Sequence, residues 1–234
     1  MALNDFYFTK MINFVTTHSI DSGKKESASL GWPTFPVSRS AIENLYGVKQ
    51  TADFHFNNAP TSWRNEAIEE YNIFEILKYH NYQNKVLDVI AHREEEEFCD
   101  LNEPLEDKFK NRFSLIIDTG TLEHCFNVGT AFKNMCEMTK LGGLIVTASP
   151  FTKMNHGYYN FCPVLYFNGF LKNGFEIIEI FLQDGRGRMI RLEDITKKNI
   201  PIRATMMCLA KKIENKQWKW PIQDKYTHNT GKVK

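Results

Sequence analysis

The sequence predicts an α/β fold in which a mostly parallel sheet carries helices on both faces. Short segments such as Phe113-Ser-Leu-Ile-Ile-Asp118 and Leu144-Ile-Val-Thr-Ala-Ser149 are almost continuously β-branched or aliphatic, as expected for strands that are buried on both faces. Segments with apolar residues three and four positions apart lie between such runs, which is typical of crossover helices.

The composition fits one ordinary globular protein. The chain has 234 residues, which is enough for one large domain and hardly for two, and its apolar (42%) and charged (24%) shares argue against disorder and coiled coil. A formal net charge of +1 gives no general attraction to nucleic acid or to an anionic membrane, and no apolar stretch is long enough to span a bilayer. The five cysteines are odd in number and form no CxxC pair, so reduced thiols in a cytoplasmic protein fit better than disulfides or a zinc site.

The first part of the chain is expected to be helical around one short extended stretch. Residues 1–26 contain a short helix and end in a polar loop, and we treat them as an N-terminal extension. Ser27–Pro33 is a short stretch interrupted by a glycine and a proline. Ser38 or Ser40 can cap a following helix, with Gly47 as its stop.

A longer helix is expected over Ser62–His80, because apolar residues recur on one face of it. Strands are then expected at Lys85–Ile90, Glu97–Leu101 and Phe113–Asp118. Asn127 can cap the next helix, in which apolar residues recur at spacings of three and four.

The remaining elements complete the sheet. Gly142-Gly143 is expected to end the helix, and a strand from Leu144 stops at Pro150. A loop and a short helix lead to strands at Phe175–Leu182 and Thr205–Ala210, which can form an antiparallel edge.

The chain therefore divides into the extension 1–26, a body at 27–212 and a polar, basic tail at 213–234. Trp218 and Trp220 can attach part of the tail to the body.

Polar residues and glycines follow the strand segments, where ligands of open α/β sheets bind. An acid after a second strand can accept from both hydroxyls of a ribose, and an acid one strand over can accept from an adenine amino group. Glycines let the backbone approach a ligand closely. Each residue alone is more often a cap or a turn residue, but their repetition at successive strand ends favours a site. The residues are Gly31, Asp88, Asp100, Asp118, Thr119, Gly120 and Ser149.

Two longer segments resemble a known family. Phe113–His124, followed by a helix and by Thr139–Pro150, resembles the fourth and fifth strands of class I S-adenosylmethionine-dependent methyltransferases. Asp100–Leu105, Gly120–His124 and His156–Pro163 are similar to a branch found among surface-glycan (capsule, polysaccharide) biosynthesis proteins. The resemblance implies a Rossmann-like sheet of seven strands, mostly parallel with an antiparallel edge strand, and S-adenosylmethionine as the cofactor.

The family's glycine-rich loop after the first strand is missing after Lys85–Ile90. We therefore assign Lys85–Ile90 to the second strand, with Asp88 as the ribose acid, and expect the first strand at Ser27–Gly31. Residues 39–80 then form a helical insertion after the first strand. The cofactor-binding residues that this assignment implies are Gly31, Trp32, Asp88, Asp100, Leu101, Asn102, Asp118, Thr119 and Gly120.

Methyl transfer to oxygen asks for alignment, exclusion of water and a group that removes the acceptor's proton. His156, after the fifth strand, is the first candidate for this base and His124 the second, although each can be a structural histidine. Other candidates would bind the acceptor, although a cap or a solvent-facing hairpin also accounts for some of them. They are Glu123, Tyr158, Tyr159, Arg186 and Arg188.

The resulting prediction is a cytoplasmic S-adenosylmethionine-dependent methyltransferase that acts on an oxygen of a small acceptor, such as an activated sugar, a glycan or a nucleotide-linked group. Two alternatives stay open: a non-catalytic methyltransferase-like module that binds a partner protein, and a nicotinamide-dependent oxidoreductase. The second alternative needs a phosphate-binding glycine turn before a helix, which is not visible. We expect no nucleic-acid partner and no metal site, since the consecutive carboxylates Glu94–Glu97 do not converge on one point.

Overall fold

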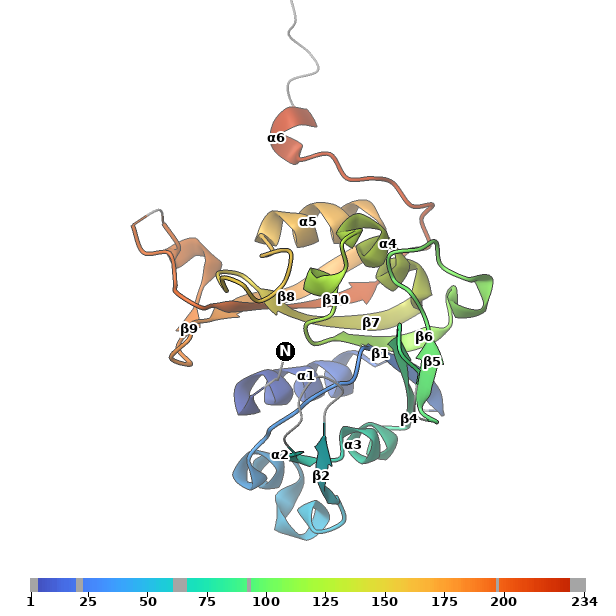
Figure 1. Cartoon of the computed structure of the whole chain (residues 1–234), viewed down its shortest axis with the longest axis vertical. Coiled ribbons are helices and arrows are strands. Elements are labelled where there is room, and N and C mark those ends of the chain that lie inside the picture. Colours follow the sequence, from blue (N-terminus) through green and yellow to red (C-terminus); the bar gives the residue numbers. More distant parts are fainter. Residues whose placement is uncertain (1–3, 20–22, 61–66, 92–93, 197, 228–234) are drawn as a thin grey trace, which may run out of the picture.

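The computed structural model describes residues 4–19, 23–60, 67–91, 94–196 and 198–227. These residues form a layered α/β fold around an eight-stranded sheet, which confirms the expected class (Figure 1). The strands, in their order across the sheet, are β5 (Glu96–Phe98), β4 (Tyr82–Asp88), β1 (Lys25–Leu30), β6 (Phe113–Asp118), β7 (Thr139–Pro150), β10 (Thr205–Lys212), β8 (Phe175–Gln183) and β9 (Met189–Ile190).

The five strands from β5 to β7 are parallel, and the remaining pairs are antiparallel. The predicted antiparallel edge is confirmed, and two details differ from the prediction. The sheet has eight strands instead of seven, because the two-residue β9 pairs with β8. The antiparallel strand β10 lies inside the sheet, between β7 and β8, and its residues are buried on both faces: Met206 and Cys208 belong to one core, Met207 and Leu209 to the other.

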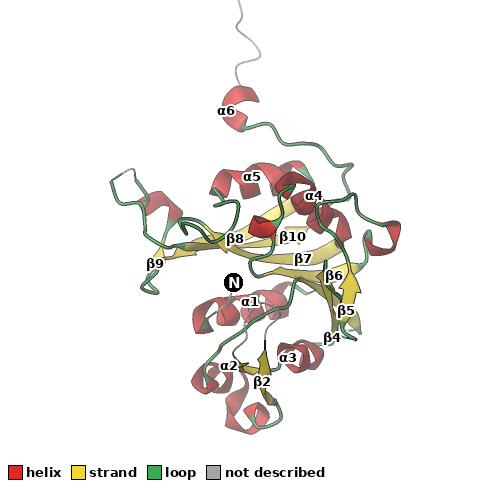
Figure 2. Cartoon of the chain, in the orientation of Figure 1, coloured by secondary structure: helices red, strands yellow, loops and turns green. Residues whose placement is uncertain are grey.

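Helices cover both faces of the sheet, and each face has its own hydrophobic core (Figure 2). In β6, Ile116 packs in the core under α4 and α5, whereas Leu115 and Ile117 pack in the core with α1, α2 and α3. This alternation is the two-residue period of a strand that is buried on both faces. The helices are α1 (Asp5–His18), α2 (Arg39–Thr51), α3 (Ile73–Tyr79), α4 (Val128–Met138), α5 (Pro163–Lys172) and α6 (Asp224–Thr227), with single 3₁₀ turns η1 (Asp107–Phe109), η2 (Leu122–His124) and η3 (Leu192–Asp194).

Capping side chains set the starts of several helices. The Ser38 hydroxyl accepts a hydrogen bond from a backbone N–H of α2, and the Asn127 side chain does the same for α4, as predicted. Asn4 caps the expected N-terminal helix α1 in the same way. Gly47, with φ of 81° and ψ of 157°, breaks the helical backbone at the predicted stop, and a second short helical stretch follows it to Thr51.

The helix predicted over Ser62–His80 is wrong. Ala67–Tyr71 is a strand, β3, that pairs with β2 (Phe56–Pro60) in a separate antiparallel sheet, and only α3 is helical. Asn72 marks the true helix start, since its side chain accepts from a backbone N–H two positions later at 3.0 Å. Residues 61–66 lie outside the described part of the chain. The expected insertion after β1 is thus two helices and a hairpin.

The glycine pair at 142 and 143 does not end α4 as predicted. Helix α4 stops at Met138, and β7 starts at Thr139 and passes through both glycines. The pairing of β6 with β7 shifts register at this place, which identifies a bulge. A Cβ on Gly143 would lie 3.1 Å from the carbonyl oxygen of Phe113, so the glycine permits the close approach of the two strands.

The start of the tail contacts α4 and the C-terminal end of α5. Trp218 packs against the core near Phe132, and the Asn173 side chain brackets the backbone of Lys219 with two hydrogen bonds of 2.8 and 3.1 Å. This contact attaches the start of the tail to the body, as the tryptophans suggested. In the described ranges, no helix is both long and apolar enough to cross a membrane.

Gly169→Ala is expected to destabilise the protein by about 1–3 kcal/mol, whereas the same change in an exposed helix stabilises. A Cβ on Gly169 in α5 would lie 2.5 Å from Cε1 of Phe132, whose ring also packs on Tyr166 and Phe170. Urea unfolding of the variant and the wild type measures the change. Phe132→Leu added to the variant should restore part of the loss. A variant as stable as the wild type would contradict the packing of α5 on α4.

Candidate functional site

The first strand ends in a bend between the carboxyl ends of β4 and β6. Gly31 has φ of 69°, in the left-handed region that favours glycine. A Cβ at Gly31 would lie 2.8 Å from Oγ1 of Thr121 and 3.9 Å from Oδ2 of Asp88. The expected strand register is confirmed, because β1 pairs in parallel with β4 and β6 and its bend lies beside the acid that ends β4.

Thr121 ties this bend to the neighbouring strand. Its hydroxyl donates to the carbonyl oxygen of Leu30, and its backbone N–H donates to Oδ1 of Asp118 at 2.9 Å. The N–H of Gly120 donates to the same oxygen at 3.3 Å. The sequence analysis missed Thr121. Asp118 at a strand end with Gly120 two residues later is the pattern of an Asx turn, and this is the local signal that could have drawn attention to the next residue, Thr121.

Asp118 is a fully buried carboxyl group, with Thr119 and Gly120 buried beside it. Its Oδ2 has no hydrogen-bond partner among the described residues. Burial, and next the negative charge of Glu123, raises the pKa of Asp118 to about 7, against the lowering effect of the backbone N–H donors. Near neutral pH this group can therefore donate as well as accept a hydrogen bond.

The carboxylate of Asp88 can accept further hydrogen bonds on the side that faces the Gly31 bend. Its side chain is half-buried, and in the described part of the chain the one hydrogen bond to its carboxylate comes from the N–H of Ile90 to Oδ1, at 3.3 Å. Oδ2 is the oxygen nearer the bend. The placement suits an acid that accepts from hydroxyls of a ligand.

The residues after β5 are less open. β5 ends at Phe98, so Asp100 to Asn102 follow the strand instead of forming its end as predicted. Oδ1 of Asp100 accepts the backbone and side-chain N–H groups of Asn102, both at 2.9 Å, and Leu101 is buried in the core. Asn102 in turn binds the backbone of Asn127, the cap of α4. This turn therefore connects the edge of the sheet to α4.

Glu123 and the two predicted histidines come together beyond Thr121. Nε2 of His156 lies 3.4 Å from Oε1 of Glu123, which is completely buried, and the rings of His124 and His156 are 5.6 Å apart. Partial burial lowers the pKa of His124, the charge of Glu123 opposes this, and His156 adds to the lowering. Two imidazoles and a carboxylate thus converge on one point at the carboxyl edge.

Exposed aromatic rings border this point. Tyr158, which is 67% exposed, packs edge-to-face on Phe126, which is 74% exposed. The hydroxyl of Tyr159 donates to the carbonyl oxygen of Phe126 at 2.8 Å, so this tyrosine holds the neighbouring loop. Sequence reasoning missed Phe126, whose exposure is not visible in a local pattern.

The other predicted residues make packing and turn contacts. Trp32 is half-buried, and its ring packs edge-to-face on Phe74 of α3, 5.2 Å between centroids. Arg188 donates to Asp184 at 2.8 Å, and the backbone N–H groups of Arg186 and Arg188 donate to the same carboxylate. The hydrogen bond from the backbone N–H of Arg188 is the main reason that the pKa of Asp184 is lowered. The turn is therefore stabilised by hydrogen bonds among its own residues. The side chain of Arg186 is exposed.

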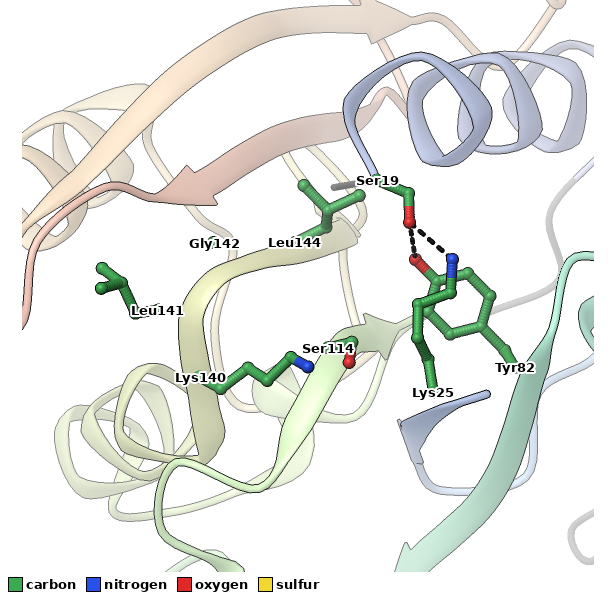
Figure 3. A pocket seen from close by; sticks show the side chains of 8 residues that line it. All are labelled: Ser19, Lys25, Tyr82, Ser114, Lys140, Leu141, Gly142 and Leu144. Carbon is green, nitrogen blue, oxygen red and sulfur yellow. Dashed lines mark hydrogen bonds between the residues drawn. The ribbon is translucent and has the colours of Figure 1, made fainter. Parts of the chain in front are cut away.

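A separate cavity of about 150 Å³ lies at the opposite edge of the sheet. In Figure 3 the Ser19 hydroxyl lies between the Lys25 ammonium group and the Tyr82 hydroxyl, with hydrogen bonds of 2.7 and 3.1 Å. Lys25 and Tyr82 begin β1 and β4, so this cavity is at the amino ends of the strands. Ligands of open α/β sheets bind at the carboxyl ends, which argues against this cavity as the main site.

No family model and no curated protein matches the chain. Similar solved structures include the [4+2]-cyclase SpnF, with 11% identity, 87% of this chain and 80% of that chain covered, and a TM-score of 0.50. Two others are the N-methyltransferase NodS from Bradyrhizobium japonicum WM9 in complex with S-adenosyl-l-homocysteine (12%, 89% and 88%, 0.44) and the citrinin polyketide synthase CMeT domain (7%, 89% and 52%, 0.48). This chain thus spans about half the length of the last. At these identities the likeness to SpnF shows the fold alone.

Proposed function

We propose that the protein is an S-adenosylmethionine-dependent methyltransferase that acts on an oxygen of a small acceptor. The observation that carries the proposal is the Gly31 bend, whose bare backbone passes Asp88 between β4 and β6. A side chain at Gly31 would fill the space in front of the Asp88 carboxylate, so the residues present fit a ligand that lies across the bend. The strand order then brings Asp100 and Asp118 to either side.

Each residue has a distinct part in this proposal. Asp88 accepts hydrogen bonds from the ribose hydroxyls, and the turn of Asp100 to Asn102 borders the adenine. Trp32 supports the bend through its packing on Phe74 of α3. Asp118, with Thr119 and Gly120, fixes the end of β6 against Leu30 through Thr121. S-adenosylmethionine supplies a methyl group that is already electrophilic. The protein therefore has to align the acceptor and exclude water.

The acceptor would bind over η2 and the loop after β7. His156, or else His124, would remove its proton beside the buried Glu123 carboxylate, and the exposed rings of Tyr158 and Phe126 would contact its apolar face. Arg186 would be the cation of the predicted pair that binds a phosphoryl group, because Arg188 is paired with Asp184. A surface-glycan or nucleotide-linked acceptor and a cytoplasmic location stay part of the proposal. The five described cysteines are free thiols, in keeping with a reducing compartment.

Calorimetric titration with S-adenosylhomocysteine tests the cofactor. We expect one binding site, and we expect Asp88→Ala to weaken it by about tenfold to hundredfold, the loss of a charge-assisted hydrogen bond. Asp53→Ala is the matched control, because Asp53 is an exposed acid that pairs with Gln50 on α2. No heat at millimolar ligand would contradict the proposal and would favour the non-catalytic module. Equal affinities in both variants would contradict the role of Asp88.

A further inference from the structure

Glu123, His124 and His156 form a cluster of potential metal ligands. One donor atom from each residue lies within 4.8 Å of the others, and the Nε2–Oε1 distance between His156 and Glu123 is already 3.4 Å. Three ligands of a tetrahedral zinc ion, each about 2.1 Å from the metal, lie about 3.4 Å apart. Small side-chain rotations of His124 on its exposed side would bring the third donor to this spacing.

The cluster contains buried polar atoms that have no hydrogen-bond partner. Glu123 has no exposed surface, and neither of its carboxylate oxygens has a partner in the described part of the chain. Nε2 of His156 is in the same state. A buried carboxylate without donors is costly unless a cation compensates its charge. Lys153 attracts Glu123 electrostatically, but it donates no hydrogen bond to either carboxylate oxygen of Glu123.

The backbone enforces this arrangement. The N–H of Tyr158 donates to the carbonyl oxygen of Glu123 at 2.8 Å, which fixes the loop after β7 directly on η2. A Cβ on Gly157 would lie 2.8 Å from both the carbonyl oxygen and Cγ of Glu123. The glycine therefore allows the loop to approach so closely that His156 reaches the buried carboxylate.

We propose that Glu123, His124 and His156 bind a divalent transition-metal ion of the zinc type. Two imidazoles and one carboxylate are the ligand set of catalytic sites that keep a coordination position open, and imidazole favours Zn²⁺, Co²⁺ and their neighbours over Mg²⁺ and Ca²⁺. The sequence analysis expected no metal site. Its candidate there was a run of consecutive carboxylates, whereas these ligands come from two segments that only the fold brings together.

The ion would give the two histidines a different part in the reaction. As ligands they leave an open position toward the acceptor side, where an acceptor hydroxyl could bind and release its proton to solvent at a lower pH. This catalytic consequence rests on the proposed methyl transfer. The binding of the ion does not, and it can be measured without any methyl donor.

Metal binding is tested with Zn²⁺ calorimetry and with the visible absorption of Co²⁺ on the full chain. We expect one Zn²⁺ per chain and a Co²⁺ spectrum of low coordination number. Glu123→Gln, His124→Ala and His156→Ala should each weaken Zn²⁺ by about hundredfold or more. His55→Ala is the matched control, because His55 and Glu75 form a 2.8 Å pair on the protein surface that belongs to no group of three potential ligands among the described residues.

The outcomes separate the two proposals. Zn²⁺ affinities that are the same in His124→Ala, His156→Ala and the wild type would overturn the metal site, even if S-adenosylhomocysteine binds. His124 is exposed, so its variant tests the site should Glu123→Gln fail to fold. Zn²⁺ binding that is lost in all three variants supports the site, even if S-adenosylhomocysteine produces no heat. In that case the ion site stands and the methyltransferase proposal falls.

Discussion

Gly31→Ala is expected to lower the affinity for S-adenosylhomocysteine by about tenfold or more. The backbone at Gly31 has φ of 69°, where a residue with a Cβ costs about 1–2 kcal/mol. The new Cβ would also lie 2.8 Å from Oγ1 of Thr121, whose hydroxyl donates to Leu30. Relief of this contact moves the bend or breaks the hydrogen bond, and either change displaces the backbone that faces Asp88. Calorimetry measures the affinity, and thermal unfolding of the same samples measures the stability.

Gly47→Ala is the matched control for the backbone term. Gly47 has φ of 81°, and a Cβ there would meet no atom within 4 Å. It should lower stability through its backbone strain alone and leave ligand affinity unchanged. The difference between the two variants therefore isolates the contact at the bend. If both variants bind S-adenosylhomocysteine equally well, the bend does not contribute to the cofactor site.

The carboxyl edge could be predicted because strand ends are local features. β6 spans the predicted Phe113–Asp118 without any shift, since the mostly apolar run is bounded by Arg112 before it and by Asp118 at its end, two residues before a glycine. The first strand is a less obvious case, because Ser27 to Leu30 contains two serines. The missing glycine loop after Lys85–Ile90, not the composition of the strand, identified it, and β1 pairs with β4 in the expected order.

The parts that could not be predicted depend on contacts between distant segments. The hydrogen bond from Thr121 to Leu30 and the pair of Glu123 with His156 join residues that only the sheet topology brings together. Residue type alone suggested the histidines as bases and gave no sign of a shared, buried carboxylate. The apolar spacing in 62–80 was misleading for another reason, since a short segment with such spacing can be a hairpin followed by one capped helix.

The residues around the Gly31 bend and the cluster of Glu123, His124 and His156 meet at one loop. The turn from Asp118 to Thr121 holds β6 to β1, and η2 continues directly from it to Glu123. A displacement at Gly31 would therefore also move Glu123 and His124, because Thr121 connects them to the bend. The turn at Asp118 in turn holds Glu123 and His124 in place. The protonation of Asp118 links the stability of this loop to pH.

Asp118→Asn is expected to remove much of the dependence of stability on pH between about pH 4 and pH 7. In the unfolded chain this carboxyl loses its proton near its ordinary pKa of 3.8, and in the folded protein burial raises the pKa to about 7. Between these values the folded state binds more protons, so the free energy of unfolding falls as the pH rises. The free energy of unfolding falls by about 1.4 kcal/mol per pH unit, on the order of 4 kcal/mol in all. The fall begins above the lower pKa and is complete above the higher one. Asparagine cannot ionise and avoids this loss.

Urea unfolding of the wild type and of Asp118→Asn at pH 4.5 and pH 8 measures the effect. Among the described residues Oδ2 has no donor, so the buried amide N–H₂ that replaces it would lack an acceptor there, which costs about 1–3 kcal/mol at both pH values. The change between the two pH values, not the stability at either one, is therefore the quantity to compare. Asp107→Asn is the control: Asp107 is exposed, and its hydrogen bond with Lys110 lowers its pKa, so it should keep the wild-type change. If Asp118→Asn also keeps it, Asp118 is ionised in the folded protein, and its second oxygen must then have a donor.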